Sequence, residues 1–308
     1  MIETFYYMYP TSIRKFYSEE IPTLEKNQPE IYDWAKILSE VTGKEIEKVL
    51  LVNNIVSMSS WCTSILAMRT DGEVIHARNL DFDRPKQLQS LVSNLEFRRK
   101  GELVFRATQV VGFYGIYTAV KPGKFSMSYN VREVHTAASP LAEVEQSLRL
   151  FVDGRRQFAA ALLQVFLEKE TYAEALAFLS TVAVDTTGYV ALASGSEGAI
   201  LSRGRLTLDH LDTLSHATPF LVATNADTWD PEVRASPAFF PRKELRRQQH
   251  ALRFLSALDR ATLTPELIYS QVLDTEEVTQ PITIFSETYL PQSGSQKVYL
   301  RKFPPASI

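Results

Sequence analysis

The sequence predicts an α+β fold in which antiparallel sheets are layered with helices. Strand-like segments come in runs that alternate with runs of helical pattern, which is typical of a layered sandwich. The central strands follow one another through short turns, as in an antiparallel meander. A chain of 308 residues with 45% apolar residues is also long enough to bury a substantial core.

Within the first sixty residues, the pattern predicts two helices. Residues 1–30 mix Tyr, Lys and Glu without a clear period. Pro29 then opens a helix that ends at Gly43 and carries apolar residues along one face, at Ile31, Trp34, Leu38 and Val41. A second helix begins at Lys44, with Ile46, Val49 and Leu50 at helical spacing.

From Cys62 the pattern changes to strands. A hairpin is predicted from Thr63–Thr70 and Glu73–Asp81, joined by the turn pair Asp71 and Gly72. Four more strands should complete the central meander: Asn94–Phe97, Leu103–Val111, Tyr114–Val120 and Lys124–Asn130.

The second half returns to helices and then adds further strands. Helices are expected at Ser139–Phe151, Gln157–Glu168, Thr171–Ser180, Arg242–Leu258 and Pro265–Leu273. Thr171 and Glu174 form a capping-box pair at the start of the third of these. The strands are predicted at Tyr189–Ala193, Ala199–Ser202, Phe220–Thr224, Ile282–Ser286 and Lys297–Leu300.

Composition excludes several classes of function. The net charge of −3 provides no basic field for nucleic acid. The one cysteine, Cys62, rules out an internal disulfide and a Cys-rich zinc site. The histidines lack metal-ligand spacing and no Gly-rich phosphate loop occurs, so neither a metal nor a cofactor is expected. The most apolar helical stretch, Phe158–Leu167, is too short to span a membrane.

The lone cysteine faces a carboxylate in the predicted hairpin. A two-residue turn at Asp71 and Gly72 pairs Cys62 with Asp81, and a neighbouring carboxylate by itself disfavours a thiolate. A cation or base is therefore needed. Arg78 would reach the thiol only through a bulge, because strict alternation puts it on the other face. Alternatively, cleavage between Trp61 and Cys62 would give Cys62 an α-amine that can act as its general base, with Asp81 orienting it.

His76 raises the alternative of a Cys–His dyad. The same register places His76 opposite Ala67, far along the strand and on the face opposite Cys62. Distance and parity both argue against a dyad.

These residues resemble a known family. Cys62-Thr-Ser-Ile65 followed by His76-Ala-Arg-Asn-Leu-Asp-Phe82 is similar to the acid ceramidase and N-acylethanolamine acid amidase family, in the cholylglycine-hydrolase branch of N-terminal-nucleophile hydrolases. Segments 112–125, 195–203 and 224–229 and the pair Arg246-Arg247 continue the likeness in the same order. It covers the chain from about residue 19 to the end.

The resemblance implies a precursor that cuts itself before Cys62. Residues 1–61 would become a helical α chain and residues 62–308 a β chain, held together without a disulfide on an αββα fold. Cys62 would be nucleophile and new N-terminus, Asp81 would hold its amine, and Arg78 would lie beside the thiolate. Asn225 matches the oxyanion-stabilising Asn and Arg246 the later Arg of the site.

Each of these residues also has an ordinary structural interpretation. Cys62 could be an inert buried residue, Arg78 and Asp81 a structural ion pair, Asn225 a turn residue and Arg246 part of a solvated helix face. The chain also departs from the family. It reads Asn130-Val131-Arg132 where the family commonly carries a Glu before the Arg, and Ala226 stands where a Tyr often follows the Asn.

The function implied is hydrolysis of N-acyl lipid amides, ceramide or N-acylethanolamines, to a fatty acid and an amine through a thioester on Cys62. Phe113, Tyr114, Tyr117 and Trp61 are candidate apolar wall residues. The alternatives are a bile-salt or penicillin-type acylase and an uncleaved, inactive lipid-binding homologue. A transient approach to a membrane or micelle would bring the lipid.

The compartment stays open at this level. Family resemblance implies a lysosomal or secretory location, whereas residues 1–20 lack a secretory signal pattern and the sequence has no Asn-x-Ser/Thr sequon. The chain is therefore expected either to be cytoplasmic or to begin after its signal.

Overall fold

Two antiparallel sheets form the centre of the molecule in a computed structural model that describes residues 2–56, 61–133 and 140–303. The five-stranded sheet runs in the order β10 (Phe220–Ala223), β1 (Trp61–Met68), β2 (Val74–Asp81), β11 (Thr283–Leu290) and β12 (Ser295–Leu300). The seven-stranded sheet runs from β3 to β9 in chain order: β3 (Val92–Arg99), β4 (Glu102–Val110), β5 (Thr118–Lys121), β6 (Phe125–Val131), β7 (Gly188–Ala193), β8 (Gly198–Arg203) and β9 (Leu208–Thr213).

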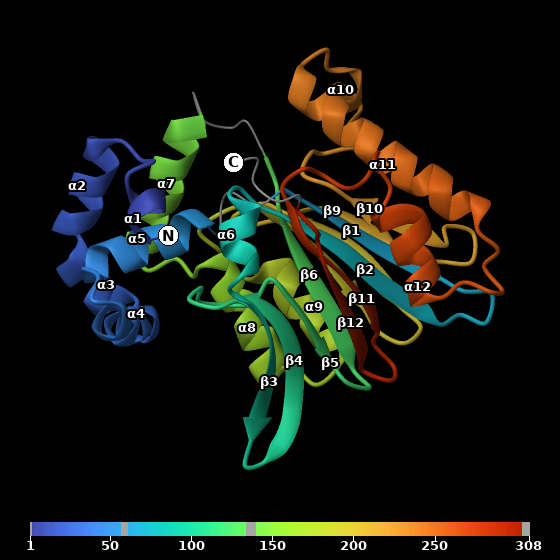
Figure 1. The fold of residues 1–308 in the computed structure, drawn as a ribbon, viewed down its shortest axis with the longest axis horizontal. Helices are drawn as coiled ribbons and strands as arrows, with labels where there is room; N and C mark the ends of the chain where they lie inside the picture. The colour runs from blue at the N-terminus through green and yellow to red at the C-terminus, as the bar shows by residue number, and fades with distance from the viewer. Residues whose placement is uncertain (1, 57–60, 134–139, 304–308) are drawn as a thin grey trace.

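Helices cover the outer face of each sheet, so the layers are αββα (Figure 1). Ile65 and Ala77 of the five-stranded sheet pack against Ala251 and Leu255 of α11 (Phe239–Ala257), beside α12 (Pro265–Ile268) and the π-helical turn Tyr269–Leu273. The seven-stranded sheet packs against α8 (Phe158–Glu168) and α9 (Tyr172–Thr181). Between the sheets, Leu66 and Val74 meet Ala191 and Ile200. The predicted layered α+β sandwich is confirmed.

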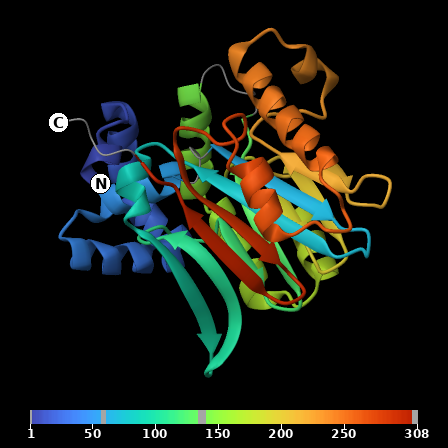
Figure 2. The same cartoon turned by 45° about the vertical axis from the view of Figure 1, so that its right-hand side comes forward.

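The N-terminal helices gather at one end of these layers (Figures 1 and 2). They are α1 (Ile2–Tyr6), α2 (Thr11–Glu19), α3 (Ile21–Asn27), α4 (Pro29–Thr42) and α5 (Ile46–Val56), and they lie beside α7 (Pro140–Val152). Gln28 donates hydrogen bonds to the carbonyl oxygens of Phe151 and Arg155, both at 2.8 Å. Leu24, Ile31 and other apolar residues of these helices belong to the same buried cluster as the outer layer of α8 and α9.

Most predicted elements are present, with ends that differ by a few residues. The capping box of Thr171 and Glu174 is confirmed at the start of α9. The helices α1 to α3, α6 (Pro85–Gln89) and α10 (Pro231–Ala235) and the strand β9 were not predicted. β9 reads Leu-Asp-His-Leu-Asp-Thr and alternates half-buried with exposed residues. Its many polar residues interrupt the apolar pattern that predicts a strand.

The register of the first hairpin differs from the prediction by one residue. Trp61 pairs with Asp81 and Cys62 with Leu80, so Cys62 does not oppose Asp81. The turn is the cause. Gly72 adopts φ +88° and its N–H bonds the Arg69 carbonyl at 3.2 Å, which makes a three-residue loop ending in a left-handed glycine instead of a two-residue turn. Because side chains alternate between the two faces of a strand, one extra loop residue moves each side chain of β2 to the other face relative to β1.

In the described part of the chain, no helix is long and apolar enough to cross a bilayer.

Candidate active site

Cys62 lies at the start of β1 with its side chain between the two sheets, fully buried. Arg78, two residues along β2 from the Cys62 partner Leu80, points to the same face. Its Nη2 donates to Cys62 Sγ at 2.8 Å, and its Nη1 donates to the Tyr117 carbonyl oxygen at 2.9 Å. The observed register therefore brings Arg78 to the thiol without the bulge that the predicted register required. A guanidinium beside sulfur favours the thiolate form.

The backbone N–H of Cys62 is bound on the other side of the strand. It donates to Asn225 Oδ1 at 2.8 Å, and Arg247 Nη2 donates to the same oxygen at 2.9 Å. Asn225 Nδ2 donates to the Val131 carbonyl oxygen at 2.6 Å. Two donors face one end of the amide and an acceptor faces the other, so these partners fix its orientation. Asn225 follows β10, which is the neighbour of β1 in the sheet.

Asp81 is buried on the face that α11 covers, and it meets cationic and hydroxyl donors there. Arg247 Nη1 donates to Asp81 Oδ2 at 2.9 Å, and Thr283 Oγ1 donates to Oδ1 at 2.6 Å. Burial raises the pKa of Asp81 to about 6, against the opposing influence of Arg247 and Thr283. Asp81 is thus linked to Cys62 through Arg247 and Asn225, not by direct cross-strand pairing.

The structure brings Arg247, rather than Arg246, to the other site residues. Arg247 is buried and also bonds Glu244, one turn earlier on α11, whereas Arg246 is exposed on the outer side of that helix. The spacing of residues along α11 would have indicated Arg247 from the sequence. Glu244, Arg247, Ala251 and Leu255 follow one another at three- and four-residue steps, which aligns Arg247 with the apolar residues that face the sheet.

A carboxylate also lies beside the residue that precedes the cysteine. Glu133 Oε1 accepts a hydrogen bond from Trp61 Nε1 at 3.3 Å, and the Glu133 backbone N–H bonds the Asn225 carbonyl at 3.0 Å. The family pattern places a Glu before the Arg, where this chain has Val131. In this chain a Glu follows Arg132 instead, at the end of β6, and it reaches Trp61.

The candidate apolar wall residues separate into three places, one of which is that of Trp61, beside Glu133 and Lys243. Phe113 and Tyr117 line a narrow slot together with Leu80, Phe82 and Val110. Tyr114 lies elsewhere, with its ring centroid 5.6 Å from that of Trp34 on α4 and its backbone N–H bonded to Asn53. The slot has a volume of about 10 Å³, so an acyl chain could enter only if its lining moved.

His76 shares the face of Cys62, so the predicted parity is wrong. Its two ring nitrogens lie 2.7 Å from Ser126 Oγ and 2.8 Å from Ser128 Oγ. Burial, together with Arg78, lowers its pKa to about 3, which keeps the ring neutral. His76 therefore bonds the two serines of β6, four residues along the sheet from the thiol.

No family model matches the chain. It is 26% identical to acid ceramidase from Mus musculus over 96% of this chain and 76% of that protein. It is 29% identical to the N-acylethanolamine-hydrolyzing acid amidase of Rattus norvegicus over 77% of this chain and 62% of that protein. A solved structure of the Caenorhabditis elegans N-acylethanolamine-hydrolyzing acid amidase ortholog superposes with a TM-score of 0.66 at 24% identity, covering 78% of this chain and all of that one.

The relatives and the solved structure agree with the resemblance seen in the motifs, and the layered sheets agree with the fold it implied. The chain is thus similar along most of its length to acid ceramidase and to N-acylethanolamine-hydrolyzing acid amidase, and it shares its fold with the solved acid amidase ortholog.

Proposed function

We propose that this chain is a self-processing N-terminal cysteine amidase that hydrolyses N-acyl lipid amides to a fatty acid and an amine. The contact of 2.8 Å between Arg78 Nη2 and Cys62 Sγ is the observation that carries this proposal. A desolvated guanidinium at the sulfur stabilises the thiolate, which is the form that a nucleophile needs. An inert buried thiol gains nothing from such a partner.

The proposed processing step uses the peptide bond between Trp61 and Cys62. The thiolate attacks the Trp61 carbonyl carbon, the C–N bond breaks, and the resulting thioester is hydrolysed by water. The products are a carboxylate on Trp61 and a free α-amine on Cys62. Glu133 supports this because its carboxylate accepts a hydrogen bond from the Trp61 side chain and so lies beside the residue whose carbonyl would be attacked.

Turnover would repeat the same chemistry on a substrate amide. The Cys62 amine accepts the thiol proton, sulfur attacks the carbonyl carbon, and the amine leaves with a proton. Water then hydrolyses the thioester and releases the fatty acid. Asn225 is the side chain proposed to stabilise the oxyanion, and Asp81 acts through Arg247 and Asn225 to hold the amine in place.

The substrate class follows from the relatives and the slot. The relatives are named for ceramide and N-acylethanolamine hydrolysis. The slot of Leu80, Phe113 and Tyr117 starts at the strand partner of Cys62 and is lined mainly by apolar side chains, so it would suit a fatty acyl chain once the lining has moved apart. Transient contact with a membrane or micelle would supply the lipid.

The test combines intact mass with hydrolysis of ceramide and palmitoylethanolamide. After acid incubation we expect the 34.9 kDa chain to give two fragments divided before Cys62, together with release of palmitate. Cys62→Ala should show neither, and Cys62→Ser, which keeps a weaker nucleophile, should be strongly impaired in both. Release of palmitate by Cys62→Ala would refute the assignment of the nucleophile. A wild-type chain that stays uncleaved and hydrolyses neither amide would favour an inactive lipid-binding protein.

A further inference from the structure

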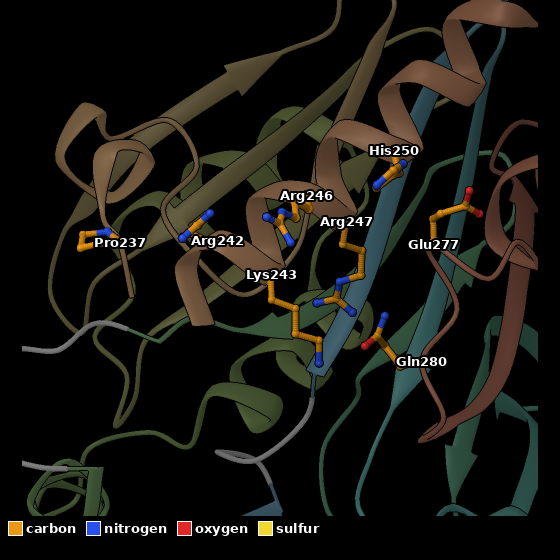
Figure 3. Close-up of a pocket in the computed structure, with 8 residues that line it drawn as sticks. All are labelled: Pro237, Arg242, Lys243, Arg246, Arg247, His250, Glu277 and Gln280. Carbon is orange, nitrogen blue, oxygen red and sulfur yellow. The ribbon is translucent and has the colours of Figure 1, made fainter. Parts of the chain in front are cut away.

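A basic pocket of about 410 Å³ opens along α11, beside the proposed active site (Figure 3). Four of its eight lining residues are Lys or Arg and one is an acid. The lining consists of Pro237, Arg242, Lys243, Arg246, Arg247, His250, Glu277 and Gln280. This concentration of positive charge contrasts with the net charge of −3 of the whole chain. A pocket of this composition suits an anion.

The positive charge of the pocket is mostly uncompensated. Arg247 pairs with Asp81 and Glu244, and Glu277 pairs with Arg253 at 3.8 Å. Within residues 2–56, 61–133 and 140–303, Arg242, Lys243 and Arg246 form no ion pair. In the same residues, the buried Nε of Arg247 has no hydrogen-bond partner. An anion in the pocket would supply the acceptor that this N–H lacks.

The pocket adjoins the strand end that carries Cys62. Arg247 Nη2 and the Cys62 backbone N donate to the same oxygen of Asn225, at 2.9 and 2.8 Å. The Lys243 ammonium lies 5.8 Å from the ring centroid of Trp61, the residue immediately before Cys62. An anion bound among these side chains would therefore lie close to the α-amine that processing would create.

The apolar slot and the basic pocket approach this strand end from opposite faces of the five-stranded sheet. Leu80 and the slot lie on the face that carries the Cys62 side chain, whereas Arg247 belongs to the helix that covers the other face. The two substituents of a trans amide point away from each other. A substrate with its carbonyl carbon at sulfur and its acyl chain in the slot would therefore extend its amine half toward the basic pocket.

We infer that the basic pocket binds an anionic group on the amine half of the substrate, so that the preferred substrates are N-acyl amino acids and N-acyl aminosulfonates rather than neutral amides. The inference rests on the proposed lipid-amide hydrolysis and narrows its substrate class. The carboxylate or sulfonate would lie among Arg242, Lys243 and Arg247 and accept charge-assisted hydrogen bonds.

The test compares N-palmitoylglycine and N-palmitoyltaurine with palmitoylethanolamide, all in nonionic micelles, using the processed enzyme. We expect kcat/KM to be at least about tenfold higher for the anionic amides. Arg242→Gln and Lys243→Gln should each reduce that ratio about tenfold, mainly by raising KM for the anionic amides. Lys15→Gln removes the same charge from α2, away from α11, and should leave the ratio unchanged (Figure 1).

The possible outcomes separate the two proposals. Equal hydrolysis of anionic and neutral amides, with a ratio that the two variants do not alter, would overturn the inference and leave the lipid-amide hydrolase intact. Failure to cleave any of the amides would overturn the proposed function itself. If instead the variants lowered neutral-amide hydrolysis only on phosphatidylserine vesicles, the pocket would be a site for lipid headgroups and the substrate inference would be wrong.

Discussion

Arg78 is buried where a charged side chain is costly, and its two Nη atoms are held by Cys62 Sγ and the Tyr117 carbonyl. Desolvation strengthens the attraction between a guanidinium and a thiolate, because little water is present to screen it. The side chain is therefore placed to activate the nucleophile, more than to stabilise the sheet.

Replacing Arg78 should show this directly. In Arg78→Gln we expect alkylation of Cys62 by iodoacetamide at neutral pH to slow about 10- to 100-fold, and amide hydrolysis to fall about 100-fold, because the thiolate loses its cation. Arg78→Lys keeps the charge and should recover part of the alkylation rate. Thermal unfolding of both variants controls for misfolding. Equal alkylation rates in Arg78→Gln and the wild type would contradict the assigned role.

Asp185 provides a pH-dependent contribution to stability away from the site. Its Oδ1 accepts the backbone N–H of Phe158 at 3.0 Å at the start of α8. Burial raises its pKa to about 7, against the backbone hydrogen bond. A raised carboxyl pKa means that the folded chain binds the proton more tightly than the unfolded chain. The contribution of protonated Asp185 to the free energy of unfolding is therefore complete below about pH 4 and is lost as the pH rises through about 7.

Asp185→Asn removes the titration and keeps the acceptor oxygen. We expect wild type and variant to be similarly stable near pH 4, and the wild type to lose on the order of 4 kcal/mol relative to the variant by pH 8. Urea unfolding at several pH values measures this difference. A difference that stays constant with pH, or grows in favour of the wild type, would show that the carboxyl is not held protonated.

The segment after β10 is held in place by a buried ion pair. Arg132, at the end of β6, donates from Nε to Asp227 Oδ1 at 2.6 Å and from Nη2 to Oδ2 at 2.8 Å. Tyr189 donates its hydroxyl to the same carboxylate at 2.5 Å. Asp227 stands two residues after Asn225, whose own Nδ2 bonds the Val131 carbonyl. Val131, the last residue of β6, and Arg132, which follows it, thus fix the loop that carries Asn225.

Breaking this ion pair should affect stability and turnover together. Asp227→Asn is expected to lower the free energy of unfolding by about 3 kcal/mol, because it leaves part of the buried Arg132 charge unpaired. Hydrolysis should fall at least about tenfold, since the position of Asn225 is disturbed. Asp209→Asn removes the other, more exposed partner of Arg132 and is the matched control. The loop assignment fails if both variants lose the same activity.

At the scale of the whole molecule, residues 1–61 are tied to the rest by packing and hydrogen bonds. Gln157 Nε2 donates to Asn54 Oδ1 at 3.1 Å, and Asn53 Oδ1 accepts from the Tyr114 backbone at 2.7 Å. Leu24, Ile31 and Leu50 to Val52 are buried in the main core cluster. A cut before Cys62 would leave these contacts unchanged.

We therefore predict that the processed α and β chains stay associated as a heterodimer. Native mass spectrometry of the cut protein should give one species of nearly the precursor mass, and denaturing electrophoresis should separate two fragments. The single cysteine makes a reducing agent irrelevant to this separation. Loss of the 1–61 fragment on native sizing would contradict the prediction. Asn54→Ala, which removes the partner of Gln157, should weaken the association.

The sequence by itself determined the layered α+β class, the segment that carries Cys62, Arg78 and Asp81, and the order of the later motifs. Apolar periodicity and turn residues are local signals, so helices such as α4 and α9 were found with nearly their observed ends. The family motifs also indicated Asn225. The polar strand β9 lacked such a signal, whereas α2 carried one, in the helical spacing of Ile13, Phe16 and Tyr17, that the sequence prediction missed.

Only the tertiary structure decided which of these residues meet. The loop with Gly72 in a left-handed conformation moved the register by one residue and placed Arg78, not Asp81, on the face of the thiol. Packing of α11 on the five-stranded sheet brought Arg247 to Asp81 and Asn225 and left Arg246 exposed. Strand register and helix rotation depend on contacts between distant segments, which no local pattern encodes.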